Sequence, residues 1–211
     1  YNLGKLSIEK STFNDNNAHG RFGWGAAILN SGNGTMEIIN STFSHNIADH
    51  SGAAVRNDGK GQTKISFSTF VNNVSGVWGG AVYAEGGTVS INNSLFSENV
   101  SNEQANDCKV MESLATLTAT NNLSNTGCGE MIATGVATLA DNGGVTQTVA
   151  LSSSSNAIDA ASECPMRQQE DQRGTFRPQG KGCDIGAYEY VELTTAATTV
   201  GICQVTTTRD V

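Results

Sequence analysis

Residues 68–82, which read STFVNNVSGVWGGAV, contain the two phrases that decide the fold. The first phrase, Ser-Thr-Phe, begins at Ser11, Ser41 and Ser68 and returns at Ser94 as Ser-Leu-Phe. The second phrase is a Gly-Ala block that begins at Gly25, Gly52 and Gly79, so that its copies lie 27 residues apart. The phenylalanines of the first phrase are 30, 27 and 26 residues apart. A fixed period of this length is the signature of a repeat architecture.

Short runs between the phrases alternate apolar and polar residues with period two, which is typical of β-strands. The apolar positions are Leu6 and Ile8, Met36 and Ile38, Ile65 and Phe67, and Val89 and Ile91. Gly, Asn or Ser bounds each run, as expected for strands separated by turns. A unit with two or three short strands fits one coil of a parallel β-helix. We therefore predict an all-β, right-handed parallel β-helix of four or five coils over residues 1–127.

Stacked coils place identical residues about 4.8 Å apart, because that is the spacing of neighbouring strands. The repeat then predicts an interior aromatic stack of Phe13, Phe43, Phe70 and Phe96. An asparagine stands three residues after each ring, at Asn16, Asn46, Asn73 and Asn99. We expect these amides to form a ladder at a turn, where asparagine also tolerates a left-handed backbone.

The composition excludes other classes of protein. Gly, Ser, Thr and Asn together make up 87 of 211 residues, while only 15% are charged and two are proline. Collagen, coiled coils and helical bundles have different compositions. The formal net charge of −8 argues against nucleic acid as a partner. No apolar run approaches 18 residues, so no membrane span is expected, and the start at Tyr1 is interpreted as that of a mature product or fragment.

The repeat ends near residue 129, and three further motifs follow. They are LADNGGVTQT at 139–148, NAIDA at 156–160 and CDIGAYE at 183–189. This series closely resembles the end of choice-of-anchor Q domain proteins, which are bacterial extracellular right-handed β-helices of the pectin-lyase-like type. The resemblance covers residues 3–189. It implies a secreted or surface-displayed protein with a variable C-terminal anchor, and it implies no reaction.

The end of the repeat divides the chain. We expect an irregular C-terminal cap at 128–190 and, in place of a recognisable anchor, a Thr-rich tail at 191–211. The tail is interpreted either as a flexible stalk or as a strand that joins the edge around Leu6 and Ile8 of a neighbouring molecule by β-augmentation.

Five cysteines are present, and none forms a Cys-x-x-Cys pair of the kind that binds zinc or serves redox chemistry. In an exported protein, disulfides are the default. Sequence order and the family pattern pair Cys108 with Cys128 and Cys164 with Cys183. Cys203 has no partner in this pairing. It is interpreted either as an unreactive buried thiol or as a residue that forms an intermolecular disulfide.

Two tryptophans directly precede glycines of the repeated block. Trp24 and Trp78 occupy this place in two coils, and Ser51 occupies it in the coil between them. Indoles two coils apart are separated by roughly 10 Å, which suits two rings of a surface glycan with Ser51 leaving a notch. The alternative is that each indole covers its own loop.

Catalytic and metal-binding residues are not predicted. The residues two places after each phenylalanine are Asp15, His45, Asn72 and Glu98, which form no stack of carboxylates. Glu37 and Lys64 are interpreted as an exposed cross-strand charge pair. The histidines are His19, His45 and His50, and they lack a repeated acidic or thiol partner. No cofactor is expected.

The C-terminal part gathers acidic residues at Asp141, Asp159, Asp171, Asp184 and Glu189. Turn and capping chemistry is the first interpretation of these acids, and a calcium site is the alternative. Arg173 and Arg177 are expected to pair with them and hold irregular backbone together.

These observations predict a non-enzymatic extracellular or cell-surface module with a structural or adhesive role. Self-assembly into a head-to-tail filament is one form of this role, because the ends of a solenoid expose unpaired strands. The alternative function is a carbohydrate-binding or carbohydrate-processing β-helix.

Overall fold

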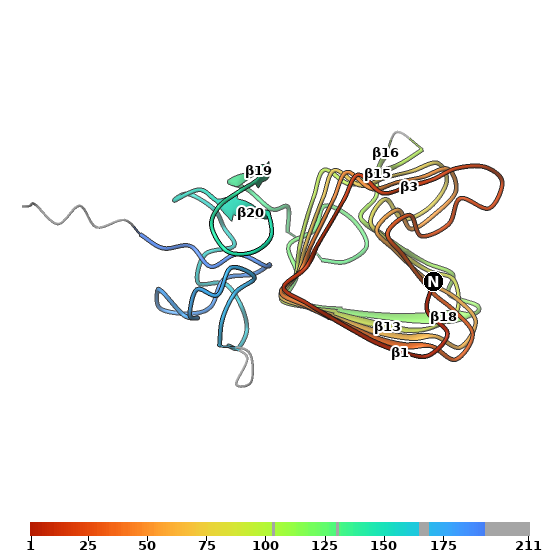
Figure 1. The fold of residues 1–211 in the computed structure, drawn as a ribbon, viewed down its shortest axis with the longest axis horizontal. Coiled ribbons are helices and arrows are strands. Elements are labelled where there is room, and N and C mark those ends of the chain that lie inside the picture. Colours follow the sequence, from red (N-terminus) through yellow and green to blue (C-terminus); the bar gives the residue numbers. More distant parts are fainter. Residues whose placement is uncertain (103, 130, 165–168, 193–211) are drawn as a thin grey trace, which may run out of the picture.

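The coils of the chain stack into a β-solenoid in which successive turns superpose when viewed end-on (Figure 1). The structure is a computed structural model that describes residues 1–102, 104–129, 131–164 and 169–192. All regular elements in these ranges are strands. The predicted all-β parallel β-helix is therefore confirmed. Among the described residues, no helix is long and apolar enough to cross a membrane.

Four sheets run along the solenoid, and each is named here after its first strand. The β1 sheet is parallel and contains β1 (Lys5–Glu9), β5 (Thr35–Ile39), β9 (Gln62–Ser66), β13 (Gly87–Asn92) and β18 (Ala115–Thr120). The β2 sheet is parallel and contains β2 (Thr12–Asn14), β6 (Thr42–Ser44), β10 (Thr69–Val71) and β14 (Leu95–Ser97).

The two remaining sheets of the solenoid consist of shorter strands. The β3 sheet contains β3 (Asn17–Ala18), β7 (Ile47–Ala48), β11 (Val74–Ser75) and β15 (Val100–Ser101), with β16 (Gln104–Ala105) added antiparallel. The β4 sheet is parallel and contains β4 (Ile28–Asn30), β8 (Val55–Asn57), β12 (Val82–Ala84) and β17 (Cys108–Val110).

The interior of the coils is an apolar core built from aligned positions. Ile38, Ile65 and Ile91 are in register on neighbouring strands and are fully buried. The rings of Phe13, Phe43, Phe70 and Phe96 stack with centroids 4.7 to 4.8 Å apart and planes within 6° of parallel. Three of these rings are fully buried, and Phe13 is half-buried because it lies in the first coil.

The asparagine ladder is continuous. The Nδ2 group of each asparagine donates to Oδ1 of the next at 2.8 Å, in the order Asn16, Asn46, Asn73 and Asn99. The last amide donates to the buried carboxylate of Asp107, also at 2.8 Å. The ladder asparagine was expected to take the left-handed backbone at this corner. The structure shows that the residue before it does so instead. These residues have φ between 53° and 56° and are Asp15, His45, Asn72 and Glu98.

A loop at 121–129 closes the C-terminal end of the coils. Asn122 donates to the carbonyl of Cys128 at 2.9 Å, and the Cys108–Cys128 disulfide joins this loop to β17. The second disulfide joins Cys164 to Cys183, so both expected pairings are present. Cys203 and residues 193–211 of the tail lie outside the described residues.

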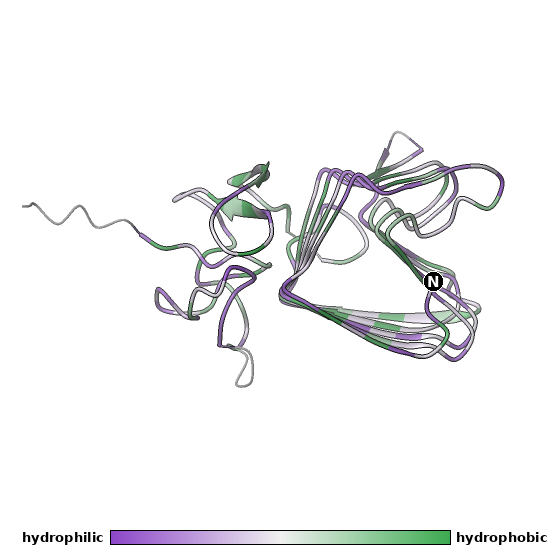
Figure 2. Cartoon of the chain, viewed as in Figure 1, coloured by the Kyte–Doolittle hydropathy of each residue, from purple (hydrophilic) through white to green (hydrophobic). Residues whose placement is uncertain are grey.

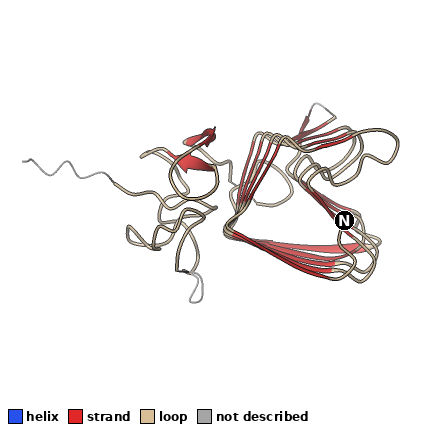
Figure 3. Cartoon of the chain, in the orientation of Figure 1, coloured by secondary structure: helices blue, strands red, loops and turns tan. Residues whose placement is uncertain are grey.

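The C-terminal segment, residues 131–192 as far as they are described, packs along the side of the coils rather than over an end (Figure 1). Most of it is loop, with one antiparallel hairpin of β19 (Val136–Ala140) and β20 (Thr148–Leu151) (Figure 3). This hairpin is hydrophobic (Figure 2) and contributes Val149 and Leu151 to a second core. The coils contribute Val71, Leu95 and Leu123 to the same core.

Polar contacts tie the C-terminal segment to successive coils. Gln172 makes the central contacts. Its Nε2 group donates to Thr12 Oγ1 at 2.7 Å, and its Oε1 atom accepts from Thr42 Oγ1 at 2.6 Å. Further along the solenoid, the backbone of Ala187 donates to Thr69 Oγ1 and that of Gly186 donates to the carbonyl of Asn93. The expected cap therefore acts as a lateral buttress that contacts four coils.

Candidate ligand site on the aromatic strip

The repeated glycines turn the chain into the β4 sheet. Gly25, Gly52 and Gly79 have φ of 57°, 62° and 60°, in the left-handed region that L side chains rarely adopt. A Cβ atom on Gly79 would also lie 2.3 Å from the carbonyl oxygen of Val82. The glycines are therefore required at these positions.

These preceding residues are Trp24, Ser51 and Trp78, and the structure brings them together. Parallel bridges join Trp24 to Ser51 and Ser51 to Trp78, as the sequence alignment of the coils predicts. The space above the small serine is not an empty notch. The His50 ring lies edge-on to both indoles, at 6.1 Å from Trp24 and 5.6 Å from Trp78.

Arg56 fills the remaining space from the outer face of β8. Its guanidinium carbon lies 4.4 Å from the ring centroid of Trp24 and 5.4 Å from that of Tyr83. Its Nη1 donates a hydrogen bond to Ser51 Oγ. The guanidinium forms an ion pair with Glu85, and its Nε faces Asp58 Oδ2 at 3.8 Å. The Arg56 side chain is only 4% exposed, so its charge is neutralised by these two carboxylates rather than by water.

Burial changes the ionisation of this cluster. It lowers the pKa of the Arg56 guanidinium, an effect that the nearby Asp58 carboxylate opposes. Burial also raises the pKa of the Tyr83 hydroxyl, which Arg56 partly offsets. Burial, together with the positive charge of Arg56, lowers the pKa of His50 from its ordinary value. His50 is therefore favoured in its neutral form beside the guanidinium.

We call the row Phe22, Trp24, His50, Trp78 and Tyr83 the aromatic strip. Phe22 lies 5.3 Å from Trp24 edge-to-face, and Trp78 stacks on Tyr83 at 5.6 Å. Phe22 is 70% exposed and Trp78 39% exposed, whereas Tyr83 is buried beneath. The strip therefore combines a rigid buried base with exposed aromatic surface.

A pocket of about 480 Å³ shares Trp24 with the strip and is named here the Trp24–Leu114 pocket after the first and last residues of its lining. Its lining comes from Trp24, which precedes the β4 sheet, from the outer face of that sheet and from the turns that follow it. The lining residues are Trp24, Arg56, Asp58, Gly59, Glu85, Gly86 and Leu114. Trp78 is outside this lining.

Arg56, Tyr83 and the two carboxylates were missed by the sequence reasoning. The outward row of the β4 sheet reads Leu29, Arg56, Tyr83 and Lys109 in register, and no two neighbours in this row are of the same chemical type. A search for identical residues at matching coil positions therefore misses them. The available signal was the odd charge in Val55-Arg56-Asn57, directly after the aligned Gly-Ala block.

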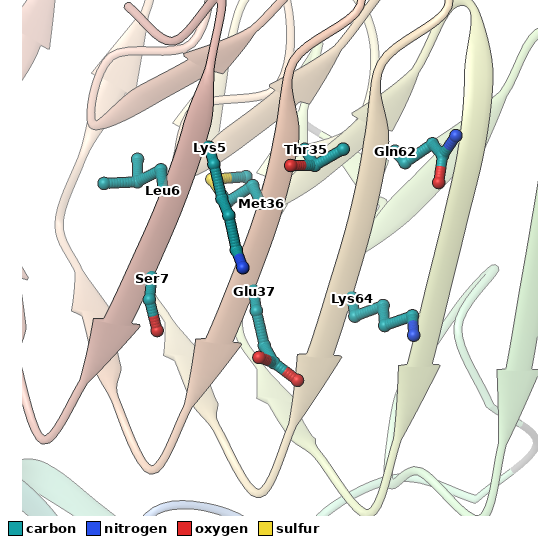
Figure 4. Close-up of a pocket in the computed structure, with 8 residues that line it drawn as sticks. All are labelled: Lys5, Leu6, Ser7, Thr35, Met36, Glu37, Gln62 and Lys64. Carbon is teal, nitrogen blue, oxygen red and sulfur yellow. The ribbon is translucent and has the colours of Figure 1, made fainter.

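A second hollow of about 410 Å³ lies over the first strands of the β1 sheet. Figure 4 shows Lys5, Glu37 and Lys64 there on successive strands. Glu37 and Lys64 are directly opposite in the strand register, where a cross-strand charge pair was expected. Mixed charge on an otherwise flat sheet face identifies no ligand.

The histidines do not converge. His19 lies 3.2 Å from Asp49 at an exposed site, His45 contacts Ser44, and His50 belongs to the aromatic strip. Within the described ranges, no three His, Cys, Asp or Glu side chains come together as metal ligands would.

The acidic residues of the C-terminal segment bind backbone and arginine groups. Arg177 Nη1 donates to Glu189 Oε2 at 2.8 Å, and both side chains are fully buried. Arg173 donates two hydrogen bonds to Asp171 Oδ2, and Asp184 accepts from the backbone nitrogen atoms of Asp159 and Tyr190. These contacts are the pairing and turn chemistry expected for the cluster.

Comparison with known proteins links one coil to a repeat family. Residues 67–85 match the Chlamydia polymorphic membrane protein repeat. The matched stretch contains β10, β11 and β12, which is less than one full coil and a small part of the chain. No curated protein and no solved structure matches the chain. The match agrees with a β-helix repeat, while the choice-of-anchor Q resemblance stays a prediction.

Proposed function

We propose that the chain is a non-enzymatic structural module of an extracellular or bacterial cell surface, and that it serves as a rigid adhesive element. The observation that carries this proposal is the unbroken set of interior ladders, buttressed along the side by the C-terminal segment. Each coil is tied to the next by stacked rings and by asparagine amides at 2.8 Å. Such a chain resists bending and holds surface residues at fixed spacing.

Two features support a location outside the cell or on its surface. One disulfide joins β17 to the closing loop and the other lies within the C-terminal segment, and disulfides persist in oxidising compartments such as the cell exterior. The matched repeat belongs to a family whose members are described as membrane proteins.

Head-to-tail assembly is the form of this function that we propose to test first. Within the described residues, β18 is an edge strand that pairs only with β13. Its sequence, ATLTAT, has no charge and no proline, although natural edge strands commonly carry one or the other to prevent pairing between molecules. A strand of another copy can extend the β1 sheet at this edge.

The experiment compares the particle size of the intact chain with that of two lysine variants, by analytical ultracentrifugation and electron microscopy. Thr118→Lys places a charge on the edge strand and should abolish oligomers or fibres. Ser90→Lys is the matched control, because Ser90 is exposed and lies opposite Thr118 on the central strand β13. If the intact chain is monomeric at all concentrations, the assembly proposal is wrong. Deleting residues 193–211 tests whether the tail supplies the pairing strand.

Carbohydrate binding is the second candidate, and the aromatic strip favours it. Exposed aromatic rings at fixed spacing offer apolar platforms to the C–H faces of sugars. Testing for adhesion to glycan-coated surfaces distinguishes this candidate from a purely structural role.

A further inference from the structure

We propose that the Trp24–Leu114 pocket binds an uncharged sugar, with Trp24 and Leu114 as its apolar contacts and Asp58 and Glu85 as acceptors for its hydroxyl groups. This inference gives a ligand class and a location to the carbohydrate-binding candidate and rests on it. It differs from binding across the two exposed indoles, since Trp78 does not line the pocket.

The charge of the pocket excludes an acidic ligand. Arg56 is its one cationic lining residue, against two carboxylates, so the lining carries one excess negative charge. The guanidinium is already bound to Ser51 and Glu85 and is almost fully buried. The donors of this cluster that have no partner, Arg56 Nε and Trp24 Nε1, are buried. An acidic sugar would therefore meet two carboxylates without an exposed donor to compensate them.

The same contacts leave acceptors free for hydroxyl groups. Asp58 Oδ2 is 3.8 Å from Arg56 Nε, which is longer than a hydrogen bond. An ionised carboxylate has about four acceptor sites. The side chains of Asp58 and Glu85 are 20% and 32% exposed, so they are held in place by Arg56 while part of each reaches solvent. Fixed acceptors of this kind orient a polyol.

The apolar residues and the glycines that line the pocket also fit a sugar. Trp24 is half-buried, with its ring against Arg56, and Leu114 is 64% exposed and follows β17 three coils further on. Gly59 and Gly86 belong to the two coils between them and have no side chains. A pyranose has apolar C–H faces and a hydroxylated rim, so it can contact the indole and the carboxylates at once.

The experiment titrates the intact chain with three uncharged trisaccharides, of the β-glucan, α-mannan and β-galactan series, and with trigalacturonate as the acidic comparison. Amide and indole chemical shifts are followed by NMR. At least one uncharged trisaccharide should shift the signals of Trp24, Gly59 and Gly86, and trigalacturonate should bind more weakly or not at all.

Variants locate the site. Trp24→Ala should weaken binding by about tenfold, the size of one lost aromatic contact. Because this change also removes support from Arg56, Asp58→Asn is the second test and should weaken binding without unfolding the chain. Trp78→Ala tests the competing site on the exposed strip, and it should leave the affinity unchanged if the pocket is the site. Phe176→Ala is the control, because Phe176 is an exposed aromatic residue outside both the strip and the pocket.

The outcomes separate this inference from the function it rests on. If Trp78→Ala weakens binding as much as Trp24→Ala, the chain binds sugar on the exposed strip and the pocket assignment is wrong. Tighter binding of trigalacturonate overturns the ligand class. If none of the four sugars causes a shift, both the pocket assignment and the carbohydrate-binding candidate fail.

Discussion

Asp107 shows how a single residue ends a repeat. At this coil the Gly-Ala block is replaced, and Ala81 pairs by its backbone with Asp107. The buried carboxylate accepts the last ladder amide from Asn99 on one oxygen. On the other oxygen it accepts from Ser124 Oγ and the backbone nitrogen atoms of Asn125 and Thr126. An acceptor-only group thus satisfies donors from both the ladder and the closing loop.

Replacing Asp107 with asparagine should therefore destabilise the chain, although the shape of the side chain is preserved. The new amide donor would face the backbone donors of the closing loop, at a cost of about 1–3 kcal/mol for unsatisfied buried groups. Urea unfolding measures this change. Glu98→Gln, at an exposed corner, is the control and should have little effect. Equal stability of the two variants would contradict the assigned role of Asp107.

His50 predicts a dependence of stability on pH. Burial and the charge of Arg56 lower its pKa below the ordinary value of 6.5, which the unfolded chain retains. As the pH falls, the unfolded state binds a proton first, so stability present above pH 6.5 is lost towards the lower folded pKa. The melting temperature of the parent should therefore fall more between pH 7 and pH 5 than that of His50→Gln. An NMR titration of the His50 ring with a midpoint at or above 6.5 would rule out this explanation.

At the scale of the element, the stability of a coil depends on its neighbours on both sides. Phe70 stacks between Phe43 and Phe96 and is fully buried. Phe70→Ala should cost roughly 3–5 kcal/mol, the range for a buried aromatic side chain. Phe13→Ala should cost clearly less, because Phe13 stacks on one ring only and is half-buried. Thermal unfolding of both variants measures the difference. Equal losses of stability would mean that the number of stacked neighbours and the burial of a ring do not decide its contribution.

The elements that could be predicted from the sequence are those whose contacts join identical residues. Strand register makes Phe43 contact Phe70 and Asn46 contact Asn73, so the repeat itself reveals these contacts. The side-on position of the C-terminal segment could not be predicted, because unlike residues form that interface. Gln172, for example, bonds to threonines of two coils that otherwise look like ordinary strand residues.

Only part of the candidate site could be predicted from the sequence, because the rest of it depends on contacts between unlike residues. The alignment of Trp24 with Trp78 follows from the period of the repeat. The pocket depends instead on Arg56, which holds Glu85 by an ion pair and has no counterpart in the two neighbouring coils, where Leu29 and Tyr83 stand in register with it. Its role becomes visible only when the outer faces of neighbouring strands are placed side by side.

At the scale of the whole molecule, the chain has two hydrophobic cores that share the β2 sheet. One core lies inside the coils and includes Phe70, and the other lies between the outer face of the β2 sheet and the C-terminal segment. Residues of β10 alternate between the two, since Phe70 points inward and Val71 packs outward. The stacked rings belong to the inner core, so we expect the coils to keep their ladders when the outer core is weakened.

Replacing Arg177 should destabilise the outer core while the inner core of the coils stays folded. It binds Glu189 and the carbonyl oxygens of Asp184 and Gly186, and its guanidinium carbon lies 5.1 Å from the Phe67 ring on the coils. Arg177→Met leaves the Glu189 carboxylate buried without its partner, a loss of about 3–5 kcal/mol.

Hydrogen exchange measured by mass spectrometry should then show faster exchange across residues 131–164 and 169–192, while the amides of β5, β9 and β13 stay protected. Lys181→Met is the control, because Lys181 is exposed in the same segment and its replacement should change neither region. If the strands of the coils lose protection together with the segment, the two cores unfold as one unit. The buttress would then be essential to the solenoid, because the ladders alone could not sustain it.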